Sequence, residues 1–408
     1  MKKKLSYNIL IALNSFKDVY SQKESIKLIS TILTTINKNE NRIFNIKSVI
    51  LADGGEFSHE VVKNNLNCQE IEVFNVINPF KQKVISSYLI LEDNSAFISS
   101  SHILRILSKD ERYKNPLHLT SYGLGQLINH ALKKGIKKIF LGLGGTNTID
   151  AGIGMLQALG VRFKDQNNLE ITPSDKKYFS GCDLSTIQYI ECLNIESFKN
   201  IEVIALCDGA ISIDEMNTPN CQKIGKTFQI EKDEILNRIE NGLQQYSRIN
   251  NVELSKKYLG VAGGINLSLS YLFKLNMKLG IDYFVEKLNI EEKIKSSDLI
   301  ITGEGKFDNS FAGKTPVGIS KIAKKYNKQV LYLVGDVENK YKKLFDDDLA
   351  VNLPEYIQQY GITSIASCHF FNNKMNKQSL DLGDYKKNTP IVFERAIKQY
   401  LLLKGFIK

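Results

Sequence analysis

The feature that most restricts the fold of this chain is a repeated pattern. A short apolar run is followed by a loop rich in glycine and acidic residues, and then by apolar residues at helical spacing. Residues 299–301 form one such run, which stops at Gly303, and residues 9–13 form another, which precedes helical spacing over residues 21–36. Runs of this kind are typical of buried parallel strands. The repeated units therefore predict an α/β fold with mostly parallel sheets.

A change of pattern divides the chain. Between residues 70 and 91 apolar and polar positions alternate, which indicates antiparallel strands and a new domain. With 408 residues the chain is long enough for two domains. Further strands are expected at residues 49–51, 94–98, 139–141, 203–206 and 329–334. Helices are expected over residues 124–134, 155–159, 260–273 and 392–403, with a hairpin-like turn at 280–282 before a helix from residue 283.

The charge and cysteine patterns disfavour several functional classes. The net charge is +10, but 44 acidic residues are mixed among 54 basic ones, and Trp is absent, so a nucleic-acid partner is not expected. The surplus of lysine predicts a solvated surface with mild attraction for anionic substrates. None of the six cysteines forms a C-x-x-C pair, which disfavours a zinc site. Disulfides are not expected in a chain of this size and kind, which fits a reducing cytoplasm. No stretch has the apolar length of a membrane span.

Residues 298–319 contain the strongest candidate for a phosphate site. The expected strand ends in a glycine loop, and Thr315 and Pro316 are good residues for an N-cap and a first helical position. Free backbone N–H groups and a positive helix end gathered at one point bind anions, most often phosphate. An ordinary strand-to-helix turn would look similar, but the added charges favour phosphate. The candidate residues here are Gly303, Glu304, Gly305, Asp308, Lys314 and Thr315.

Carboxylates and glycines also follow other expected strands. Asp53 and Glu56 stand in a Gly-Gly loop, and Asp208 follows the expected strand at 203–206. In open α/β sheets the carboxyl ends of strands form the ligand site, although aspartate is equally at home in turns and N-caps. A second glycine loop, at residues 142–152, lacks the strict G-x-G-x-x-G spacing of a dinucleotide fingerprint, which disfavours a dehydrogenase. The remaining candidate contacts are Ser15, Lys17, Gly144, Gly145 and Asp150.

Taken together, these segments resemble the type 1 glycerate kinase family over nearly the whole chain. The segments that carry the resemblance are residues 14–17, 52–56, 115–123, 144–150, 155–160, 207–208, 262–264, 301–308 and 313–316. The resemblance implies ATP-dependent phosphorylation of D-glycerate with magnesium. It also implies a split, Rossmann-like parallel-sheet domain formed by residues 1–78 and 283–408, with an inserted mixed α/β domain at residues 79–282. The oligomeric state is left open, and a homodimer is one possibility.

The chain departs from the family pattern at several points. Ser99 and Ser100 stand where a glutamate and a methionine are usual, and Ile149 replaces an asparagine. The family's Asn-Pro-Leu block after Asp208 is missing, and a later Gly-Pro-Gln-Lys motif survives only around Gln222. Two alternatives therefore remain: a kinase for another small hydroxy acid, or a relative that binds ligands without turnover.

Phosphoryl transfer needs charge neutralisation, alignment of the reacting groups and a proton acceptor. In a type 1 glycerate kinase, the glycine loop that begins at Gly303 would hold the ATP phosphates together with Lys314. Lys17 would pair with the glycerate carboxylate or with a phosphate. The candidate Mg²⁺ ligands are Asp53, Asp208 and Asp308, since Mg²⁺ prefers one or two carboxylates with phosphate oxygens and water. One of the three carboxylates would accept the hydroxyl proton, and Asp208 is the favoured one.

Overall fold

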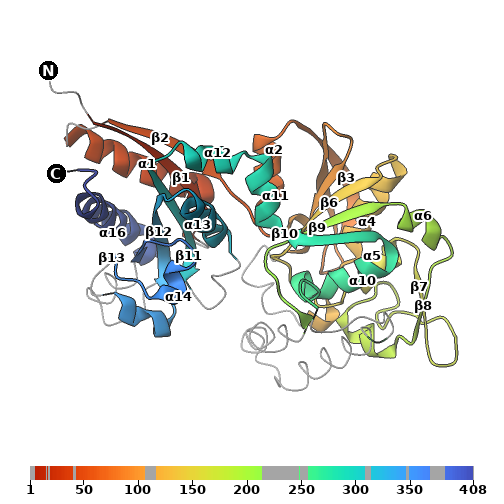
Figure 1. Ribbon diagram of the computed structural model, residues 1–408. Helices are drawn as coiled ribbons and strands as arrows, with labels where there is room; N and C mark the ends of the chain where they lie inside the picture. The colour runs from red at the N-terminus through yellow and green to blue at the C-terminus, as the bar shows by residue number, and fades with distance from the viewer. Residues whose placement is uncertain are drawn as a thin grey trace. The chain divides into compact units, whose positions relative to one another are not determined.

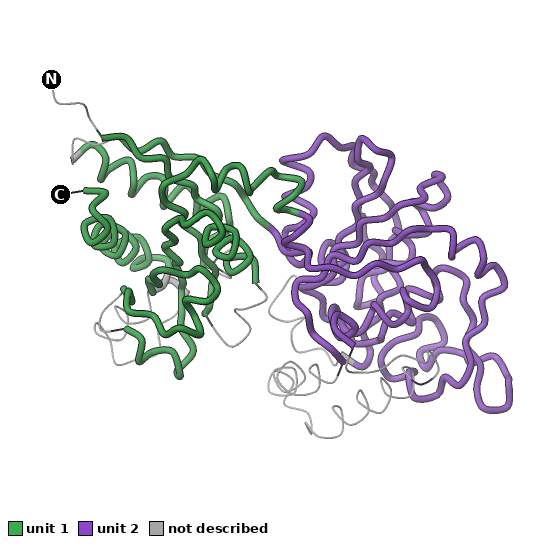
Figure 2. The backbone as a smooth tube through the Cα atoms, viewed as in Figure 1, with its two compact units in different colours: residues 1–51, 284–408 green, residues 52–283 purple. Residues whose placement is uncertain are grey.

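The structure is a computed structural model, and it describes residues 5–14, 16, 19–39, 43–105, 116–213, 248, 256–307, 314–345, 349–367 and 382–407. The chain divides into two compact units, coloured separately in Figure 2. Unit 1 comprises residues 1–51 and 284–408, and unit 2 comprises residues 52–283. Both ends of the chain thus form one unit, and the other is inserted between them. The predicted class, two α/β units of which one is discontinuous, is confirmed.

Unit 1 contains a six-stranded sheet in the order β13-β14-β12-β11-β1-β2 (Figure 1). All neighbouring pairs are parallel except β13 with β14. The strands are β1 (Ser6–Leu13), β2 (Ile43–Ile50), β11 (Leu299–Phe307), β12 (Gln329–Val337), β13 (Leu349–Ala350) and β14 (Ser364–Ser367). The helices are α1 (Gln22–Asn39), α12 (Ile290–Lys295), α13 (Thr315–Lys325), a 3-10 helix (Asn339–Leu344), α14 (Glu355–Gln358) and α16 (Leu382–Leu403).

Helices cover both faces of this sheet. On β1, Ile9 and Ile11 point to a core shared with α1 and α16, because alternate residues of a strand face opposite sides. On the other face, Val317 of α13 packs in a second core with Tyr332 of β12. Residues 9–13 are fully buried. A continuous apolar run is what a strand covered on both faces requires, so this part of the prediction is confirmed.

The closing helix of unit 1 contains a proline. Pro390 lies inside α16, where it cannot donate a backbone hydrogen bond to the carbonyl of Lys386. The hydroxyl of Tyr20 donates to that carbonyl instead. The ring of Phe16 packs on Phe393 of the same helix, with 5.4 Å between ring centroids. The segment that follows β1 is therefore attached to α16 at two points.

Unit 2 contains a second six-stranded sheet, in the order β10-β9-β6-β5-β4-β3. The four strands from β10 to β5 are parallel, and β4 and β3 add an antiparallel hairpin. The strands are β3 (Cys68–Ile77), β4 (Lys83–Leu91), β5 (Ala96–Ser99), β6 (Lys138–Leu143), β9 (Glu202–Cys207) and β10 (Lys274–Leu279), with a separate hairpin of β7 (Arg162–Lys164) and β8 (Tyr189–Glu191).

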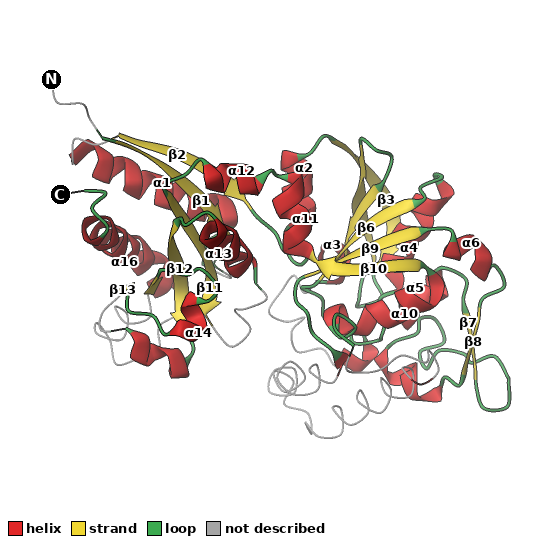
Figure 3. Cartoon of the chain, viewed as in Figure 1, coloured by secondary structure: helices red, strands yellow, loops and turns green. Residues whose placement is uncertain are grey.

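The helices of unit 2 also form layers around the sheet (Figure 3). One core joins the sheet to α4, α5 and α10 through residues such as Leu141, Leu127 and Met155. The helices are α2 (Ser58–Asn65), α3 (Ser100–Leu104), α4 (Tyr122–Lys133), α5 (Ile153–Ala158), α6 (Ile195–Lys199) and α10 (Ile265–Leu272). Short 3-10 helices span Pro116–His118, Gly181–Thr186 and Val261–Gly264, and α11 (Gly280–Lys287) leads from unit 2 back into unit 1.

Two expectations differ from this arrangement. The boundary expected after residue 78 falls at residue 51, because β3 pairs with β4 and so belongs to the sheet of unit 2. The turn expected at residues 280–282 is the first turn of α11, and the strand β10 before it was not predicted. Among the described residues, no helix combines the length and the apolar character that a membrane crossing requires.

Candidate functional site

In unit 2, the carboxyl ends of β6 and β9 bring one predicted carboxylate to the second glycine loop. The two strands are parallel neighbours, with Leu143 opposite Cys207. The next backbone N–H, that of Asp208, donates to the carbonyl oxygen of Leu143 at 3.0 Å. This bond continues the ladder by one step past the last paired residue. Asp208 is therefore held beside the start of the glycine loop that follows Leu143.

The loop after residue 52 brings a second carboxylate to the same place. A β-carbon on Gly54 would overlap the carbonyl of Leu206, so only glycine permits this close approach to β9. A β-carbon on Gly55 would lie 3.2 Å from both Asp208 Oδ2 and Asp53 Oδ1. The Asp53 carboxylate accepts a hydrogen bond from the N–H of Gly55 at 3.1 Å. The side chains of Asp53 and Asp208 thus flank one stretch of backbone.

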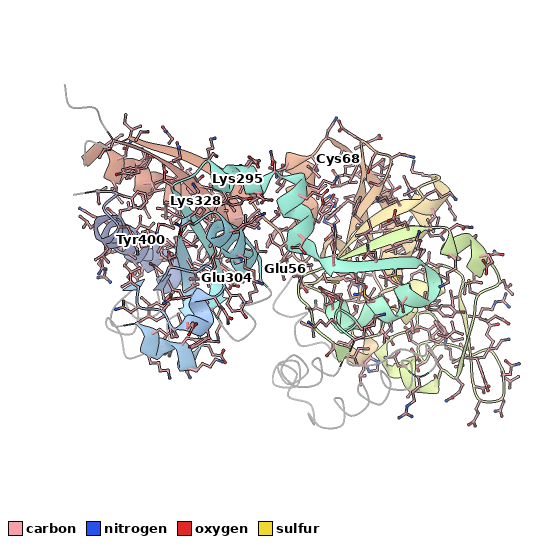
Figure 4. All side chains as sticks on the ribbon, in the orientation of Figure 1. Glu56, Cys68, Lys295, Glu304, Lys328 and Tyr400 are labelled. Carbon is pink, nitrogen blue, oxygen red and sulfur yellow. The ribbon has the colours of Figure 1, made fainter. Side chains whose placement is uncertain are left out.

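The second glycine loop completes this group of residues. Gly144 has φ +153°, and a β-carbon there would overlap the carboxylate of Asp208. A β-carbon on Gly145 would lie 2.5 Å from Cγ of Glu56. Five predicted site residues therefore lie together at the strand ends of unit 2. They are Asp53, Glu56, Gly144, Gly145 and Asp208, which we call the acidic site; Glu56 is labelled in Figure 4.

Two serines support the acidic site. Ser100 Oγ accepts from the N–H of Gly144 at 3.3 Å and lies 3.4 Å from the carbonyl oxygen of the same residue. Ser101 Oγ donates to the carbonyl oxygen of Gly55 at 3.1 Å. Both serines are buried at the start of α3, directly after β5. From the sequence, Ser100 stood out only as a departure from a family pattern, and the run of three serines at a strand end was the available signal.

Asp150 has a different environment from the other predicted carboxylates. It is fully buried, and its carboxylate accepts four hydrogen bonds, from the N–H and hydroxyl of Ser121 and the N–H groups of Gly152 and Gly154. Burial raises the pKa of the Asp150 carboxyl, and the hydrogen bonds oppose that rise. These contacts join the starts of α4 and α5. The geometry favours a structural role for Asp150, and its predicted contact with a ligand stays a prediction.

In unit 1, the residues predicted as a glycine loop are part of a strand. β11 continues through Phe307, and Gly303 and Glu304 pair with Leu333 and Val334 of β12. The strand continues because Phe307 is fully buried, with its ring 5.6 Å from that of Tyr332 between centroids. The prediction of a loop beginning at Gly303 was therefore wrong. Because strand pairing already uses this backbone, Gly303, Glu304 and Gly305 do not begin an open loop of free N–H groups.

Glu304 and Lys314 form an ion pair in unit 1. Lys314 Nζ lies 2.9 Å from Glu304 Oε2, and the Glu304 side chain is 9% exposed (Figure 4 labels Glu304). The hydroxyl of Tyr332 donates to the other carboxylate oxygen. The helix α13 begins at Thr315, with Lys314 as its N-cap and Pro316 in its first turn. A helix does start here, as predicted, but one residue earlier: Thr315 is its first residue and not its N-cap.

Three predicted residues lie outside the described part of the chain. They are Ser15, Lys17 and Asp308, whose roles stay predictions. Within the described ranges, no three side chains of His, Cys, Asp or Glu are grouped so as to hold a metal ion. Asp53 and Asp208 nevertheless supply two carboxylates beside one stretch of backbone, and Mg²⁺ commonly takes one or two carboxylates from the protein and the rest from phosphate and water.

Comparison with known proteins agrees with the fold and with the motifs. The family model "Glycerate kinase family" matches residues 9–358. The chain is 30% identical to glycerate kinase of Haemophilus influenzae over 370 residues, which is 86% of this chain and 92% of that protein. It is also 30% identical to glycerate 2-kinase of Escherichia coli over 375 residues, or 88% of this chain and 90% of that protein.

A solved structure shows the same fold. It is a crystal structure from Salmonella typhimurium LT2 described as a glycerate kinase 2, and it superposes with a TM-score of 0.66 over 98% of this chain and 100% of that chain. The two sequences are 24% identical, so this likeness concerns the fold alone. The family model covers most of the chain, and two relatives reach 30% identity over most of their own length. The chain belongs to the glycerate kinase family.

Proposed function

We propose that this protein is a type 1 glycerate kinase, which transfers the γ-phosphoryl group of ATP to a hydroxyl group of D-glycerate with Mg²⁺ as cofactor. Family membership supports the reaction class. The observation that carries the proposal is the acidic site of unit 2, where Asp53 and Asp208 flank Gly55 beside Gly144. Phosphoryl transfer depends on positioning and on charge neutralisation, and two carboxylates held beside one stretch of glycine backbone are groups that suit a cation.

Asp208 is the proposed proton acceptor. Its backbone is fixed to Leu143, and its side chain lies against Gly144, so the carboxylate is held by the sheet edge itself. A general base must reach the proton that it removes, and a rigid strand end is a suitable platform. The proposed Mg²⁺ ligands come from the same set of carboxylates, Asp53 and Asp208 of unit 2 and Asp308 outside the described residues, and Asp208 is the one that would instead accept the proton. When bound, Mg²⁺ supplies positive charge to phosphate oxygens.

In unit 1, the start of α13 and Lys314 are the proposed phosphate contacts. Glu304 and the carbonyl of Lys306 lie 2.9 and 3.1 Å from Lys314 Nζ, so the ammonium group is oriented by the protein. An oriented lysine at a helix N-terminus attracts anions through its own charge and through the helix dipole. Ser15, Lys17, Gly145, Asp150 and Glu56 remain proposed substrate or phosphate contacts.

The small-molecule substrate would be bound without a nucleic-acid or membrane partner, and we infer a cytoplasmic location from the cysteine pattern. One relative carries the name glycerate 2-kinase, which favours the 2-hydroxyl group as acceptor. A second candidate substrate is another small hydroxy acid, favoured by Ser100 at the acidic site and by Ile149, which is buried in the second glycine loop.

The test is ADP release with D-glycerate for the wild type, Asp208→Asn and a control, Asp165→Asn. Asp165 accepts backbone hydrogen bonds in a turn outside the acidic site, and asparagine can accept them as well. Loss of a general base lowers kcat by about 10²–10⁴-fold. We expect such a loss in Asp208→Asn alone, and an unchanged rate would remove Asp208 from the chemistry.

A panel of hydroxy acids separates the alternatives. Turnover with D-glycerate above all others supports the proposal. Turnover only with another acid supports the second candidate substrate. Binding of ATP without turnover of any acid indicates a non-catalytic relative.

A further inference from the structure

A cluster of polar side chains in unit 2 lies outside the acidic site. Its members come from four elements: His59 from α2, Glu70 from β3, Ser87 from β4 and His102 from α3. β3 begins at Cys68, which Figure 4 labels. The two imidazole rings stack, with 4.1 Å between centroids and 9° between planes. His59 is buried, while His102 is exposed on the solvent side of the stack.

The hydrogen bonds of the cluster fix where its protons lie. Ser87 has one hydroxyl proton, and it donates to Glu70 Oε1 at 2.9 Å. His102 Nε2, at 3.2 Å from Ser87 Oγ, must therefore be the donor in that pair. His59 Nε2 lies 3.0 Å from Glu70 Oε1, which has no proton to give, so it also donates. Both rings thus carry the proton on Nε2.

This arrangement also explains an otherwise isolated atom. His59 Nδ1 is buried, and within the described part of the chain it has no hydrogen-bond partner. In the Nε2–H tautomer, Nδ1 carries a lone pair and no proton. A buried acceptor without a partner costs less free energy than a buried N–H group without one. Lys63 pairs with the second carboxylate oxygen of Glu70. Lys63 holds the pKa of Glu70 down, to about 2.

Each helix of the cluster is directly continuous with the acidic site. α2 follows Glu56 and Phe57, and α3 carries Ser100. α3 also contacts the segment before α2 at both of its ends: Ser101 Oγ, in the first turn of α3, donates to the carbonyl of Gly55, and the guanidinium of Arg105, the C-cap of α3, lies 5.8 Å from the centroid of the Phe57 ring. A shift of α2 against α3 would therefore move the loop at residues 53–56 relative to Gly144.

We propose that the His59 and His102 stack, joined through Ser87 to Glu70, is a positioning device that holds the loop at residues 53–56 and the Ser100 side chain in the arrangement that phosphoryl transfer requires. The geometry supports positioning rather than metal binding, because within the described ranges no three acidic, histidine or cysteine side chains could hold a metal ion. The positioning role in catalysis rests on the proposed function. The structural coupling between the cluster and the loop can be measured without turnover.

The test compares two adjacent buried serines of β4. Ser87→Ala removes the link between His102 and Glu70, whereas Ser86→Ala removes a hydroxyl group that has no hydrogen-bond partner among the residues that the structure describes. Both changes delete one buried oxygen from neighbouring positions of one strand. Hydrogen exchange of peptides covering residues 52–57 and 98–104 is measured at a temperature where circular dichroism shows both variants fully folded. His102→Phe, which keeps a ring at an exposed position, is a second variant that does not depend on tolerance at Ser87.

We expect Ser87→Ala and His102→Phe to raise exchange in these two peptides selectively. We also expect kcat with ATP and D-glycerate to fall about tenfold, since small displacements of reacting groups have effects of this size, with KM changed much less. Ser86→Ala is expected to match the wild type. Equal behaviour of the two serine variants, or exchange raised uniformly across unit 2, would overturn the proposal. Absence of turnover in the wild type would refute the proposed function. The hydrogen-exchange comparison of the variants would then still decide whether the cluster holds the loop at residues 53–56.

Discussion

The two units hold their candidate carboxylates in opposite ways. In unit 1, Glu304 is 9% exposed, pairs with Lys314 and accepts from the hydroxyl of Tyr332. In unit 2, Asp53 and Asp208 are half-buried, and they flank Gly55. The Glu304 carboxylate is enclosed by its partners, whereas the Asp53 and Asp208 carboxylates lie beside glycine residues.

This difference separates two uses of the same residue type. A buried carboxylate with a cation and a hydroxyl donor orients its partners, because its own lone pairs are already occupied. A carboxylate that lies against glycine backbone is held close to the main chain at a point where no other side chain intervenes. We therefore assign orientation of Lys314 to Glu304, and substrate chemistry to Asp53 and Asp208. The following predictions test that division.

The largest effect is expected at the closest approach in unit 2. In Gly144→Ala the new methyl group would overlap the Asp208 carboxylate, and φ +153° is a backbone conformation that alanine rarely adopts. Displacement of Asp208 should lower kcat by at least about 10²-fold. Steady-state ADP release measures this.

The matched control is Gly160→Ala. Gly160 also has a positive φ, +85°, but a β-carbon there would meet nothing within 4 Å. It therefore bears backbone strain of about 1–2 kcal/mol without a new contact. We expect reduced thermal stability with kcat near the wild-type value. Equal losses of kcat in the two variants would show that the close approach to Asp208 is irrelevant.

An intermediate effect is expected at the ion pair of unit 1. Lys314→Met should lower ATP affinity about tenfold, since a hydrogen bond to a charged group is worth about 1.5–3 kcal/mol. It should also lower the free energy of unfolding by about 1–3 kcal/mol, because Glu304 loses its cation while buried. Calorimetric titration with ATP and urea unfolding measure the two quantities.

The double variant Lys314→Met/Glu304→Gln separates these two consequences. Glutamine removes the unpaired charge and keeps an acceptor for Tyr332, so the free energy of unfolding should recover while ATP affinity stays low. Recovery of affinity in the double variant would mean that Lys314 affects ATP only through the fold. The assignment of Lys314 to phosphate would then fail.

The smallest effect is a pH dependence confined to unit 2. Loss of water from the ring face stacked on His59 lowers the pKa of His102, with Glu60, Arg105 and Glu70 as further charges nearby. The unfolded chain therefore binds a proton at His102 at higher pH than the folded chain does, so stability is present above the ordinary value of 6.5 and declines as the pH falls below it.

The exposure of His102 keeps this effect modest. The contribution of Glu70 has the same direction but declines only between 4.5 and about 2, so a loss near pH 5–6 reports on His102. Urea unfolding followed by hydrogen exchange should show unit 2 losing stability before unit 1 in that range. His102→Phe should flatten the profile, and a profile unchanged by that substitution would contradict the assignment.

Much of the fold could be predicted from apolar runs, because strands covered on both faces require them. β1 and β9 are such strands. β10 is not: none of its residues is fully buried, two are exposed, and lysines occupy residues 274 and 278. The helix was expected to begin after Pro390, at residue 392, because proline normally interrupts a helix. It begins before the proline, and the Tyr20 hydroxyl bonds to the Lys386 carbonyl that the proline leaves without its helical donor.

The candidate site was predictable where local chemistry alone decides it. Asp53, Gly144 and Asp208 each follow a strand, and the pairing of β6 with β9 brings Gly144 and Asp208 together. Asp53 follows β2 of the other sheet and reaches them through the close approach of Gly54 to β9. Gly303 and Glu304 followed the same local rule but belong to a strand, because the distant Phe307 is buried and extends the pairing. The support from Ser101 and His59 depends on contacts between elements, which no single stretch of sequence contains.

The bond between Tyr20 and the Lys386 carbonyl has a consequence for biosynthesis. Every strand of the sheet in unit 2 is encoded between residues 68 and 279, so that unit can form while translation continues. The segment after β1 must wait, because Tyr20 and Phe16 find their partners on α16, near the end of the chain. A ribosome-bound chain would thus carry a folded unit 2 well before the segment after β1 contacts α16.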